Sequence, residues 1–356
     1  MRQVCIFNGD MSRGGGTERI AQLLSSGLAN REGYDVIVLS LSNATDDSYY
    51  PLHEKVRHRS LKEKSIMGRI RELRRFLRTE AIDVLINVDV MLGIYSIPAV
   101  FGMRKRTKLI SWEMFNIRND IGSKHTDLIR RVSLGYCDAY VCQTEGDMKA
   151  FEREMPVRCL LSCVYNPCVY DEAYVDYDAG SKTIMTAGHF FHTKGYDLAV
   201  EVAAEVFPKH PDWEWRFYGD GPQMEAVKKQ ATKLGVRNNV VFCGRTKNMT
   251  DAYRHAAMYV MTSRTEGFGL VLTEAKANNL PTLAFDVEFG PREIIESGVS
   301  GELVGAFDVK GMASAICGLI EDTEKRKLYS QQARINLNKF SEKGFVDNWI
   351  RIMEAL

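Results

Sequence analysis

Residues 258–278 read MYVMTSRTEGFGLVLTEAKAN and combine a strand, a glycine turn and the start of a helix. The apolar run Met258–Thr262 has the length of a buried strand, and a helical run through Glu274 to Asn278 follows the turn. The turn itself, Gly267–Gly269, presents backbone N–H groups at a helix start, where they can hold an anion. Strand–turn–helix units of this kind build parallel sheets with crossover helices.

The same rhythm of short apolar runs and longer amphipathic stretches extends along the whole chain. Near-continuous apolar runs are typical of strands that are buried on both faces of a parallel sheet. We predict strands at Val4–Phe7, Val36–Leu41, Val84–Val88, Lys108–Trp112, Ala139–Cys142, Thr183–Ala187, Trp215–Tyr218, Val240–Cys243, Met258–Thr262 and Thr282–Phe285. This pattern predicts an α/β protein with two doubly wound domains that face each other across a cleft.

Length and composition agree with two globular domains. The chain has 356 residues, and single hydrophobic cores stop growing near about 250–300 residues. A polar, tyrosine-rich stretch without helical periodicity, Asn166–Lys182, is the predicted linker. The values of 45% hydrophobic and 26% charged residues exclude disordered, collagen-like and coiled-coil chains. The net charge of +1 gives no reason to expect a nucleic-acid partner.

The cellular location is predicted from the absence of membrane and secretion signals in the sequence. No run approaches the roughly 20 apolar residues of a membrane helix, and the first residues do not have the apolar core of a secretory signal. The eight cysteines have no regular spacing, and no histidine pair accompanies the densest group, Cys159–Cys168. We predict reduced thiols, no metal site and a cytoplasmic protein.

Two further loops have the character of a phosphate cradle. Gly14–Gly16 follows the first strand and precedes an apolar-periodic helix, and Gly188–Gly195 follows the first strand of the second half. In the second loop Lys194 can place a point charge on a diphosphate, and His189 or His192 can add a donor. A tight turn without a ligand and a solvated loop with a chance lysine are the alternatives.

The strongest candidates are the two carboxylates of the opening stretch. Glu266 precedes the glycine turn and Glu274 follows eight residues later, inside the helix. Carboxylates accept hydrogen bonds from sugar and ribose hydroxyls, so two at this spacing can hold both ends of one nucleotide-sugar. The alternative is structural, with Glu266 as a helix cap and Glu274 as a solvated helix residue. A glycosidase pair is a further alternative, but it gives no use to a diphosphate cradle.

These residues resemble the Glu-x7-Glu signature of retaining glycosyltransferases with the GT-B fold, particularly glycosyltransferase family 4. The resemblance implies two Rossmann-like domains: residues 1–172 bind the acceptor, residues 178–338 bind the nucleotide-sugar, and the last helix, 339–356, returns to the N-terminal domain. Its further motifs follow in family order: GGTER at Gly15–Arg19, NPC at Asn166–Cys168, Lys194-Gly195, YGDGP at Tyr218–Pro222, FCGR at Phe242–Arg245 and FGPREII at Phe289–Ile295.

The resemblance also implies residue roles. Glu266 would bind hydroxyls of the donor sugar, Glu274 the ribose hydroxyls, and Lys194 would neutralise the departing diphosphate without a metal or cofactor. His189 would serve the phosphate loop, where relatives usually have arginine. Other donor-binding positions would be Gly16, Thr17, Gly188, Gly244, Arg245, Gly267, Phe268, Gly269 and Leu270. On the acceptor side Met114 stands where relatives commonly have histidine, and Glu113 or Asn116 would compensate.

A local charge bias indicates an anionic partner. Residues 51–131 contain 18 Lys and Arg against 9 Asp and Glu, and the stretch Ser65–Arg78 places arginines from Arg69 to Arg78 beside one apolar stripe. Such a helix can lie at an anionic membrane surface, where each basic residue contributes about 1 kcal/mol. The alternative is an ordinary helix that packs its stripe on the sheet. No aromatic–basic pattern of the nucleic-acid-binding kind accompanies it.

The predicted function is transfer of a hexose or N-acetylhexosamine from a nucleotide-sugar, with uridine diphosphate as the expected carrier. The acceptor would be a glycan or lipid-linked glycan in surface polysaccharide or lipopolysaccharide biosynthesis. Two alternatives stay open: a non-catalytic glycosyltransferase-like partner subunit, and a sugar-nucleotide epimerase on the same fold. A phosphorylase on this fold would require a cofactor lysine and a far longer chain.

Overall fold

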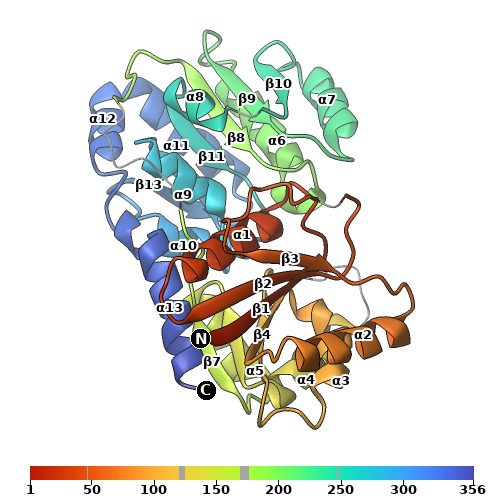
Figure 1. Cartoon of the computed structure of the whole chain (residues 1–356). Coiled ribbons are helices and arrows are strands. Elements are labelled where there is room, and N and C mark those ends of the chain that lie inside the picture. Colours follow the sequence, from red (N-terminus) through yellow and green to blue (C-terminus); the bar gives the residue numbers. More distant parts are fainter. Residues whose placement is uncertain (46, 120–124, 169–175, 247) are drawn as a thin grey trace. The chain divides into compact units, whose positions relative to one another are not determined.

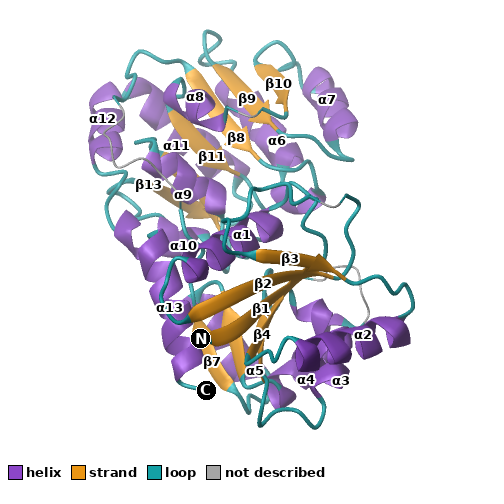
Figure 2. Ribbon diagram, viewed as in Figure 1, coloured by secondary structure: helices purple, strands orange, loops and turns teal. Residues whose placement is uncertain are grey.

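The structure is a computed structural model that describes residues 1–45, 47–119, 125–168, 176–246 and 248–356. The described chain divides into two compact units. The N-terminal unit consists of Met1–Pro167 with Ser341–Leu356, and the C-terminal unit of Cys168–Phe340. Each unit has a parallel sheet with helices packed against it (Figures 1 and 2). Of the predicted linker, residues 169–175 lie outside the described residues.

The sheet of the N-terminal unit has the strand order β3-β2-β1-β4-β5-β6-β7, and all the pairings are parallel. Its strands are β1 (Arg2–Asn8), β2 (Tyr34–Ser40), β3 (Arg57–Ser60), β4 (Val84–Val88), β5 (Lys108–Trp112), β6 (Ala139–Cys142) and β7 (Leu160–Cys163). Its helices are α1 (Gly16–Ala29), α2 (Ile66–Thr79), α3 (Gly93–Val100), α4 (Thr126–Tyr136), α5 (Glu145–Glu154) and α13 (Glu342–Glu354).

The sheet of the C-terminal unit has the order β10-β9-β8-β11-β12-β13 and is also parallel. Its strands are β8 (Thr183–Ala187), β9 (Glu214–Tyr218), β10 (Val240–Gly244), β11 (Met258–Met261), β12 (Thr282–Asp286) and β13 (Gly301–Gly305). Its helices are α6 (Tyr196–Val206), α7 (Met224–Lys233), α8 (Met249–Arg254), α9 (Leu270–Ala277), α10 (Pro291–Ile294), α11 (Val309–Glu321) and α12 (Thr323–Gln331). The two sheets confirm the predicted α/β class with two doubly wound halves.

Strands in the interior of each sheet match the predicted ones, whereas three edge strands were not predicted. All five residues of β4 are buried, so its sequence is a continuous apolar run. The edge strand β3 reads RHRS, β7 reads LLSC and β13 reads GELVG, and none of the three is buried along its whole length. An edge strand is paired on one side only, and its residues therefore need not be apolar on both faces.

Short polar side chains fix several helix starts. Ser65 at the start of α2, Thr144 at the start of α5 and Ser341 at the start of α13 each accept a hydrogen bond from a backbone N–H of the first helical turn. Helix α2 buries Leu73 and Leu77 of its apolar stripe in the core of this unit, as the structural alternative expected, whereas Ile66 at its start is exposed. Within the part of the chain that the structure describes, no helix has the length and apolar character needed to cross a bilayer.

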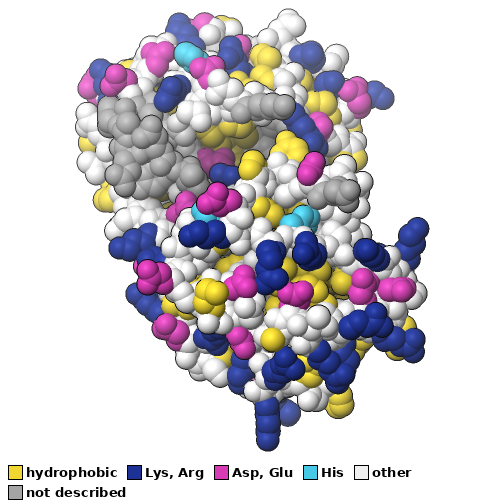
Figure 3. Space-filling view, in the orientation of Figure 1, with side chains coloured by type: hydrophobic (Ala, Val, Ile, Leu, Met, Phe, Trp, Pro, Cys, Tyr) yellow, Lys and Arg dark blue, Asp and Glu magenta, His cyan; other side chains and the backbone are white. Residues whose placement is uncertain are grey.

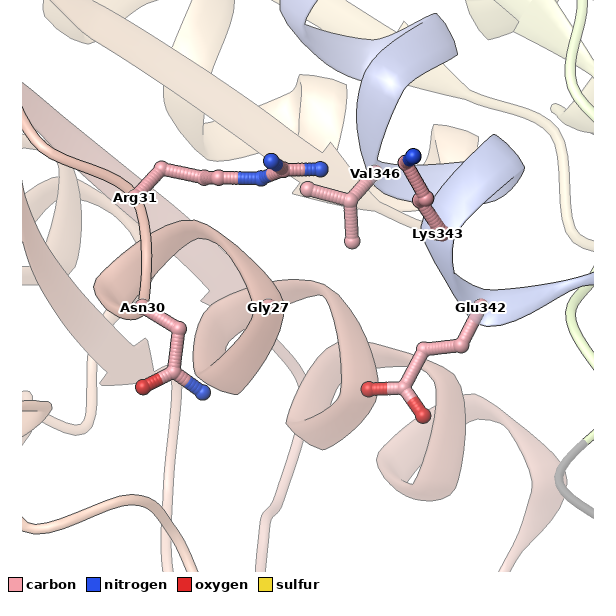
Figure 4. Close-up of a pocket in the computed structure, with 6 residues that line it drawn as sticks. All are labelled: Gly27, Asn30, Arg31, Glu342, Lys343 and Val346. Carbon is pink, nitrogen blue, oxygen red and sulfur yellow. The ribbon is translucent and has the colours of Figure 1, made fainter.

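The last helix, α13, packs against α1 and the end of β5. Trp349 on α13 is fully buried and meets the ring of Trp112 at a centroid distance of 4.6 Å. Arg31, just after α1, pairs with Asp347 at 2.5 Å. A hollow beside this contact is lined by Gly27, Asn30, Arg31, Glu342, Lys343 and Val346 (Figure 4).

Gly27 of α1 faces Val346 of α13 at short range, and its substitution tests this packing. A Cβ built on Gly27 would lie 2.3 Å from Cγ2 of Val346, whose β-branched side chain is stiff within a helix. We expect Gly27→Ala to lower the free energy of unfolding by about 1–2 kcal/mol, measured by urea denaturation, because overpacking outweighs the better helix propensity of alanine.

Gly135→Ala in α4 is the matched control, since nothing lies within 4 Å of its added Cβ. This variant should be stabilised by up to about 1 kcal/mol. Equal stabilisation by both substitutions would show that Gly27 does not mark a tight contact.

Candidate active site

Two loops meet at the carboxyl edge of the C-terminal sheet. Strands β8 and β11 are neighbours at its centre, and the chain leaves β8 toward β9 on one side and leaves β11 toward β12 on the other. This is a topological switch point, where open parallel sheets leave a crevice for ligands at the carboxyl ends of the strands. The loops after β8 and β11 are residues 188–195 and 262–269, which contain the sequence-predicted residues Lys194 and Glu266.

Lys194 and Glu266 form an ion pair across this switch point. Nζ of Lys194 lies 2.8 Å from both Oε1 and Oε2 of Glu266. The Glu266 side chain is only 5% exposed, while that of Lys194 is 32% exposed. A nearly buried carboxylate beside a reachable ammonium provides a hydrogen-bond acceptor and a positive charge within one ligand's reach.

A glycine makes this pairing possible. Gly195 has φ 63°, and a Cβ at this position would lie 2.0 Å from the carbonyl oxygen of Thr262. The Thr262 hydroxyl also donates to the Gly195 carbonyl at 2.9 Å. The two loops therefore touch through their backbones, and this contact sets the distance between Lys194 and Glu266.

The turn after Glu266 opens the start of α9. Gly269 has φ 103° and is the N-cap residue of α9, which begins at Leu270, so the cap position itself carries no side chain. Phe268 is 2% exposed and stacks edge-on against Phe340 at 5.4 Å. Gly267 is half-buried beside it. The N-cap residue of α9 is thus a glycine, and backbone N–H groups at such a helix start can hold an anion.

Glu274 lies one to two turns into α9 and is half-buried. Its Oε2 accepts a hydrogen bond from the hydroxyl of Tyr253 at 2.9 Å, and Tyr253 is itself buried. This contact holds the Glu274 carboxylate in one orientation. The structure thus places Glu266 and Glu274 on one strand–turn–helix unit, as the sequence predicts, although their roles toward a ligand stay predictions.

His189 and Arg245 share one carboxylate that sequence reasoning did not single out. Nδ1 of His189 lies 3.8 Å and Nε of Arg245 2.8 Å from the two oxygens of Asp220. The three side chains are about half exposed. A Cβ on Gly219 would lie 1.9 Å from the carbonyl oxygen of Gly188, so the loops after β8 and β9 are in backbone contact. Asp220 is the aspartate of the YGDGP motif, so this motif could have identified it in the sequence.

Gly244 ends β10 next to this cluster. Its carbonyl accepts a hydrogen bond from the N–H of Gly219 at 2.8 Å. The loop after Gly244, which includes Arg245, therefore lies beside the loop after β9. Its predicted place beside the nucleotide base stays a prediction.

In the N-terminal unit, the predicted loop at Gly14–Gly16 holds a carboxylate of its own. Burial raises the pKa of Glu18, while the backbone N–H groups of Glu18 and Gly15 stabilise its ionised form. Gly16 is exposed and Thr17 half-buried at the start of α1. The amides of this loop are thus partly used by Glu18, and the predicted role of Gly16 and Thr17 toward the donor stays a prediction.

Of the residues predicted on the acceptor side, two point into the protein. Glu113 is fully buried, with Oε2 lying 2.8 Å from Nε of Arg130 and 2.7 Å from the hydroxyl of Tyr140. Asn116 is also fully buried, and its carbonyl accepts from Arg130 at 2.7 Å. This burial gives no support to a direct contact of either side chain with an acceptor. Met114 is half-buried, and its sulfur accepts from the Gln143 amide.

A buried acid beside this network makes stability depend on pH. Asp147 is fully buried, its Oδ1 accepts from the N–H of Ile117 at 2.8 Å, and its Oδ2 has no hydrogen-bond partner among the described residues. Burial raises the pKa of Asp147 to about 8, with the charge of Glu113 adding to the shift. The unfolded chain releases this proton near about pH 3.9. The folded state therefore binds more protons between these values, and its stability falls as pH rises.

Asp147→Asn tests this dependence, because the amide keeps an acceptor for Ile117 but does not ionise. We expect the stability of the variant relative to wild type to increase by up to about 1.4 kcal/mol per pH unit between pH 5 and 7, the slope for one proton. Urea denaturation at three pH values measures it. A constant difference across this range would show that Asp147 ionises equally in both states.

Residues 175–336 match a family model whose description is Glycosyl transferases group 1. This part of the chain is similar to that family. It contains Lys194, Glu266 and Glu274, so the carboxyl edge described above lies inside the matched region. Together with the relatives described next, this match supports transfer of a glycosyl group as the coarse activity, as the sequence predicts.

The chain is similar to other glycosyltransferases over nearly its whole length. An uncharacterized glycosyltransferase of Haemophilus influenzae is 25% identical over 359 residues, which span 99% of this chain and 100% of that one. A Campylobacter jejuni enzyme, named as an α-1,4-N-acetyl-D-galactosaminyltransferase that acts on a diphospho-undecaprenol-linked glycan, is 24% identical and spans 95% of each chain.

Solved structures show the same fold. Anabaena HepE in complex with UDP matches with a TM-score of 0.80 at 17% identity, over 100% of both chains. The predicted GT-B fold is thereby confirmed for this glycosyltransferase.

Proposed function

We propose that the protein is a retaining glycosyltransferase of family 4 that transfers a hexose or N-acetylhexosamine from a UDP-sugar to a glycan or lipid-linked glycan. The observation that carries the proposal is the pair Lys194–Glu266 at the switch point of the C-terminal sheet, next to the start of α9. A cation and the amides of a helix start can bind the diphosphate, and a carboxylate can accept hydrogen bonds from the sugar hydroxyls.

Binding of the donor would separate the ion pair. Lys194 would turn to the diphosphate and neutralise the charge that develops as it leaves, which is electrostatic stabilisation of the transition state. Glu266 would then accept hydrogen bonds from sugar hydroxyls, and Glu274 from the ribose. In the retaining course that we propose, the acceptor attacks from the front face and the departing phosphate oxygen takes its proton.

The relatives guide the choice of substrates. The Campylobacter relative carries an undecaprenol-linked glycan in its name, and this supports a lipid-linked acceptor and a place in surface polysaccharide or lipopolysaccharide biosynthesis. A neighbour of the same fold was solved with UDP, so uridine is the first nucleotide to test.

Titration calorimetry with UDP tests the donor site. We expect wild-type protein to bind UDP and Glu274→Ala to bind at least about tenfold more weakly, because the ribose loses a charged acceptor. Glu225→Ala on α7, which removes an exposed carboxylate paired with Lys228, is the control and should bind as wild type. No heat of binding from wild type with UDP or any other nucleoside diphosphate would contradict the donor site.

We further propose that the protein meets an anionic membrane surface through α2. Ile66 and Met67 at the start of α2 are 55% and 58% exposed. Arg71, Arg75 and Arg78 are exposed on the same helix, and Lys and Arg side chains gather over this part of the surface (Figure 3). Exposed apolar side chains beside exposed cations are the features of an interfacial helix.

Sedimentation with vesicles of phosphatidylglycerol and phosphatidylcholine tests this contact. Wild type should bind vesicles in proportion to their phosphatidylglycerol content, and Arg71→Glu with Arg75→Glu should abolish the binding. Lys229→Glu with Lys233→Glu on α7 reverses two exposed charges elsewhere and should not change it. Equal sedimentation of both double variants would contradict the role of α2.

A further inference from the structure

Asp89, the residue after β4, has a backbone conformation that is sterically unfavourable for any residue with a side chain. Asp89 has φ 113° and ψ 127°, a region that is populated almost only by glycine. Two contacts hold it there. Its N–H donates to the carbonyl of Trp112 at 3.2 Å, and its Oδ1 accepts from the N–H of Met91 at 2.8 Å. The surrounding structure thus fixes both the backbone and the carboxylate of Asp89.

Asp89 lies at the switch point of the N-terminal sheet. Strands β1 and β4 are neighbours, and the chain leaves β1 toward β2 on one side and leaves β4 toward β5 on the other. This position in the N-terminal unit corresponds to that of the Lys194–Glu266 pair in the C-terminal unit. A ligand of the N-terminal unit is therefore expected at the carboxyl ends of β1 and β4.

Asp89 is less buried than the two carboxylates that follow β5 and β6. Glu113 and Asp147 are fully buried, and Glu113 is paired with Arg130. Asp89 is half-buried. Burial raises the pKa of Asp89 to about 6, the charge of Glu113 adds to the shift, and the N–H of Met91 and the charge of Arg130 oppose it. At neutral pH Asp89 is mainly ionised and accepts hydrogen bonds.

We propose that Asp89 binds a hydroxyl of the acceptor sugar and positions it for transfer. This inference rests on the proposed function and names a contact in the N-terminal unit that the sequence did not indicate. A carboxylate repels phosphate and attracts hydroxyls, so the group held at this point is a neutral sugar hydroxyl and not a lipid diphosphate. The strained backbone aims the carboxylate at that hydroxyl.

Two substitutions separate the carboxylate from the strain. Asp89→Asn keeps an acceptor for the Met91 N–H and about the same backbone strain, and Asp89→Gly removes both the side chain and the steric cost. Ala81→Gly is the matched control, because Ala81 also has a positive φ, 51°, and precedes the opposite end of β4.

Three readouts are measured with UDP-hexoses and UDP-N-acetylhexosamines: UDP release without acceptor, transfer to a panel of octyl glycosides, and the melting temperature. Both Asp89 variants should release UDP within about twofold of wild type but transfer to octyl glycosides at least about tenfold more slowly. Asp89→Gly should melt at or above the wild-type temperature, as expected where strain is relieved. Ala81→Gly should transfer as wild type.

Equal transfer by Asp89→Asn and wild type would overturn the inference, as would a parallel loss of UDP release and transfer. A wild-type protein that turns over a donor but transfers to no octyl glycoside would also overturn it. Wild-type protein that neither binds UDP nor turns over any donor would instead sink the proposed function, so the two failures are distinguishable.

Discussion

Lys194→Ala should lower the release of nucleoside diphosphate from the preferred nucleotide-sugar by about 10²–10³-fold. The reason is that the departing diphosphate loses the cation paired with Glu266 at the switch point, where removal of a preorganised charge-stabilising donor has this effect. Lys194→Arg should restore part of the rate, because the charge returns in another geometry. A coupled assay for the released diphosphate measures all three proteins.

Lys182→Ala is the matched control for this loss. Lys182 pairs with Asp212 at 2.6 Å, but both side chains are more than half exposed. Exposed pairs contribute about 0–1 kcal/mol to stability, and this one lies away from the switch-point loops. Loss of such a donor is expected to slow release by about 10²-fold or more. If Lys194→Ala released diphosphate within about threefold of the Lys182→Ala rate, Lys194 would not act on the diphosphate.

Arg130→Met should have the largest effect on stability. Arg130 is 1% exposed and is the guanidinium partner of the fully buried Glu113. Removing one member of a buried ion pair leaves an uncompensated charge, so we expect the free energy of unfolding to fall by about 3–5 kcal/mol in urea denaturation. Donation from Arg130 to the Asn116 carbonyl is lost as well, which frees the loop after β5.

Two controls separate charge from packing. Adding Glu113→Gln to Arg130→Met should recover part of the loss, because no unpaired charge is then buried. Arg118→Ala removes the exposed pair with Glu154 and should cost no more than about 1 kcal/mol. If Arg130→Met and Arg118→Ala had equal cost, the buried network would not stabilise this unit.

The fold could be predicted from sequence wherever burial leaves an apolar run. Strands β4, β5, β6 and β8 have the predicted bounds, because interior strands of a parallel sheet are apolar on both faces. The edge strands β3, β7 and β13 carry charged, polar or glycine residues, so no run marks them. Partial exposure removes the pattern on which the prediction depends.

The candidate site could be predicted where its chemistry is local. Lys194 and Glu266 each lie in a glycine-rich loop after a strand, and both loops were identified in the sequence. Their pairing with each other could not be predicted, because it depends on the backbone contact between Gly195 and Thr262. The pairing of Glu113 with Arg130 could not be predicted either, because it depends on how α4 packs against β5.

The site at Asp89 could not be predicted from the sequence either. Its sequence context, a polar residue after a buried strand, is common to many strand ends. What distinguishes it is a φ of 113° and the burial of the neighbouring carboxylates Glu113 and Asp147. Neither property is encoded by local residue types, and both depend on how β4, β5 and α4 pack.

The central claim is that the Lys194–Glu266 pair belongs to a nucleotide-sugar site, and donor turnover tests it most directly. Release of nucleoside diphosphate would be measured for a panel of nucleotide-sugars with wild type and Glu266→Ala. We expect slow release from one donor by wild type and no release by the variant, whose melting temperature stays close to that of wild type. Release that is unchanged in Glu266→Ala, or no release and no binding of any nucleoside diphosphate by wild type, would contradict it.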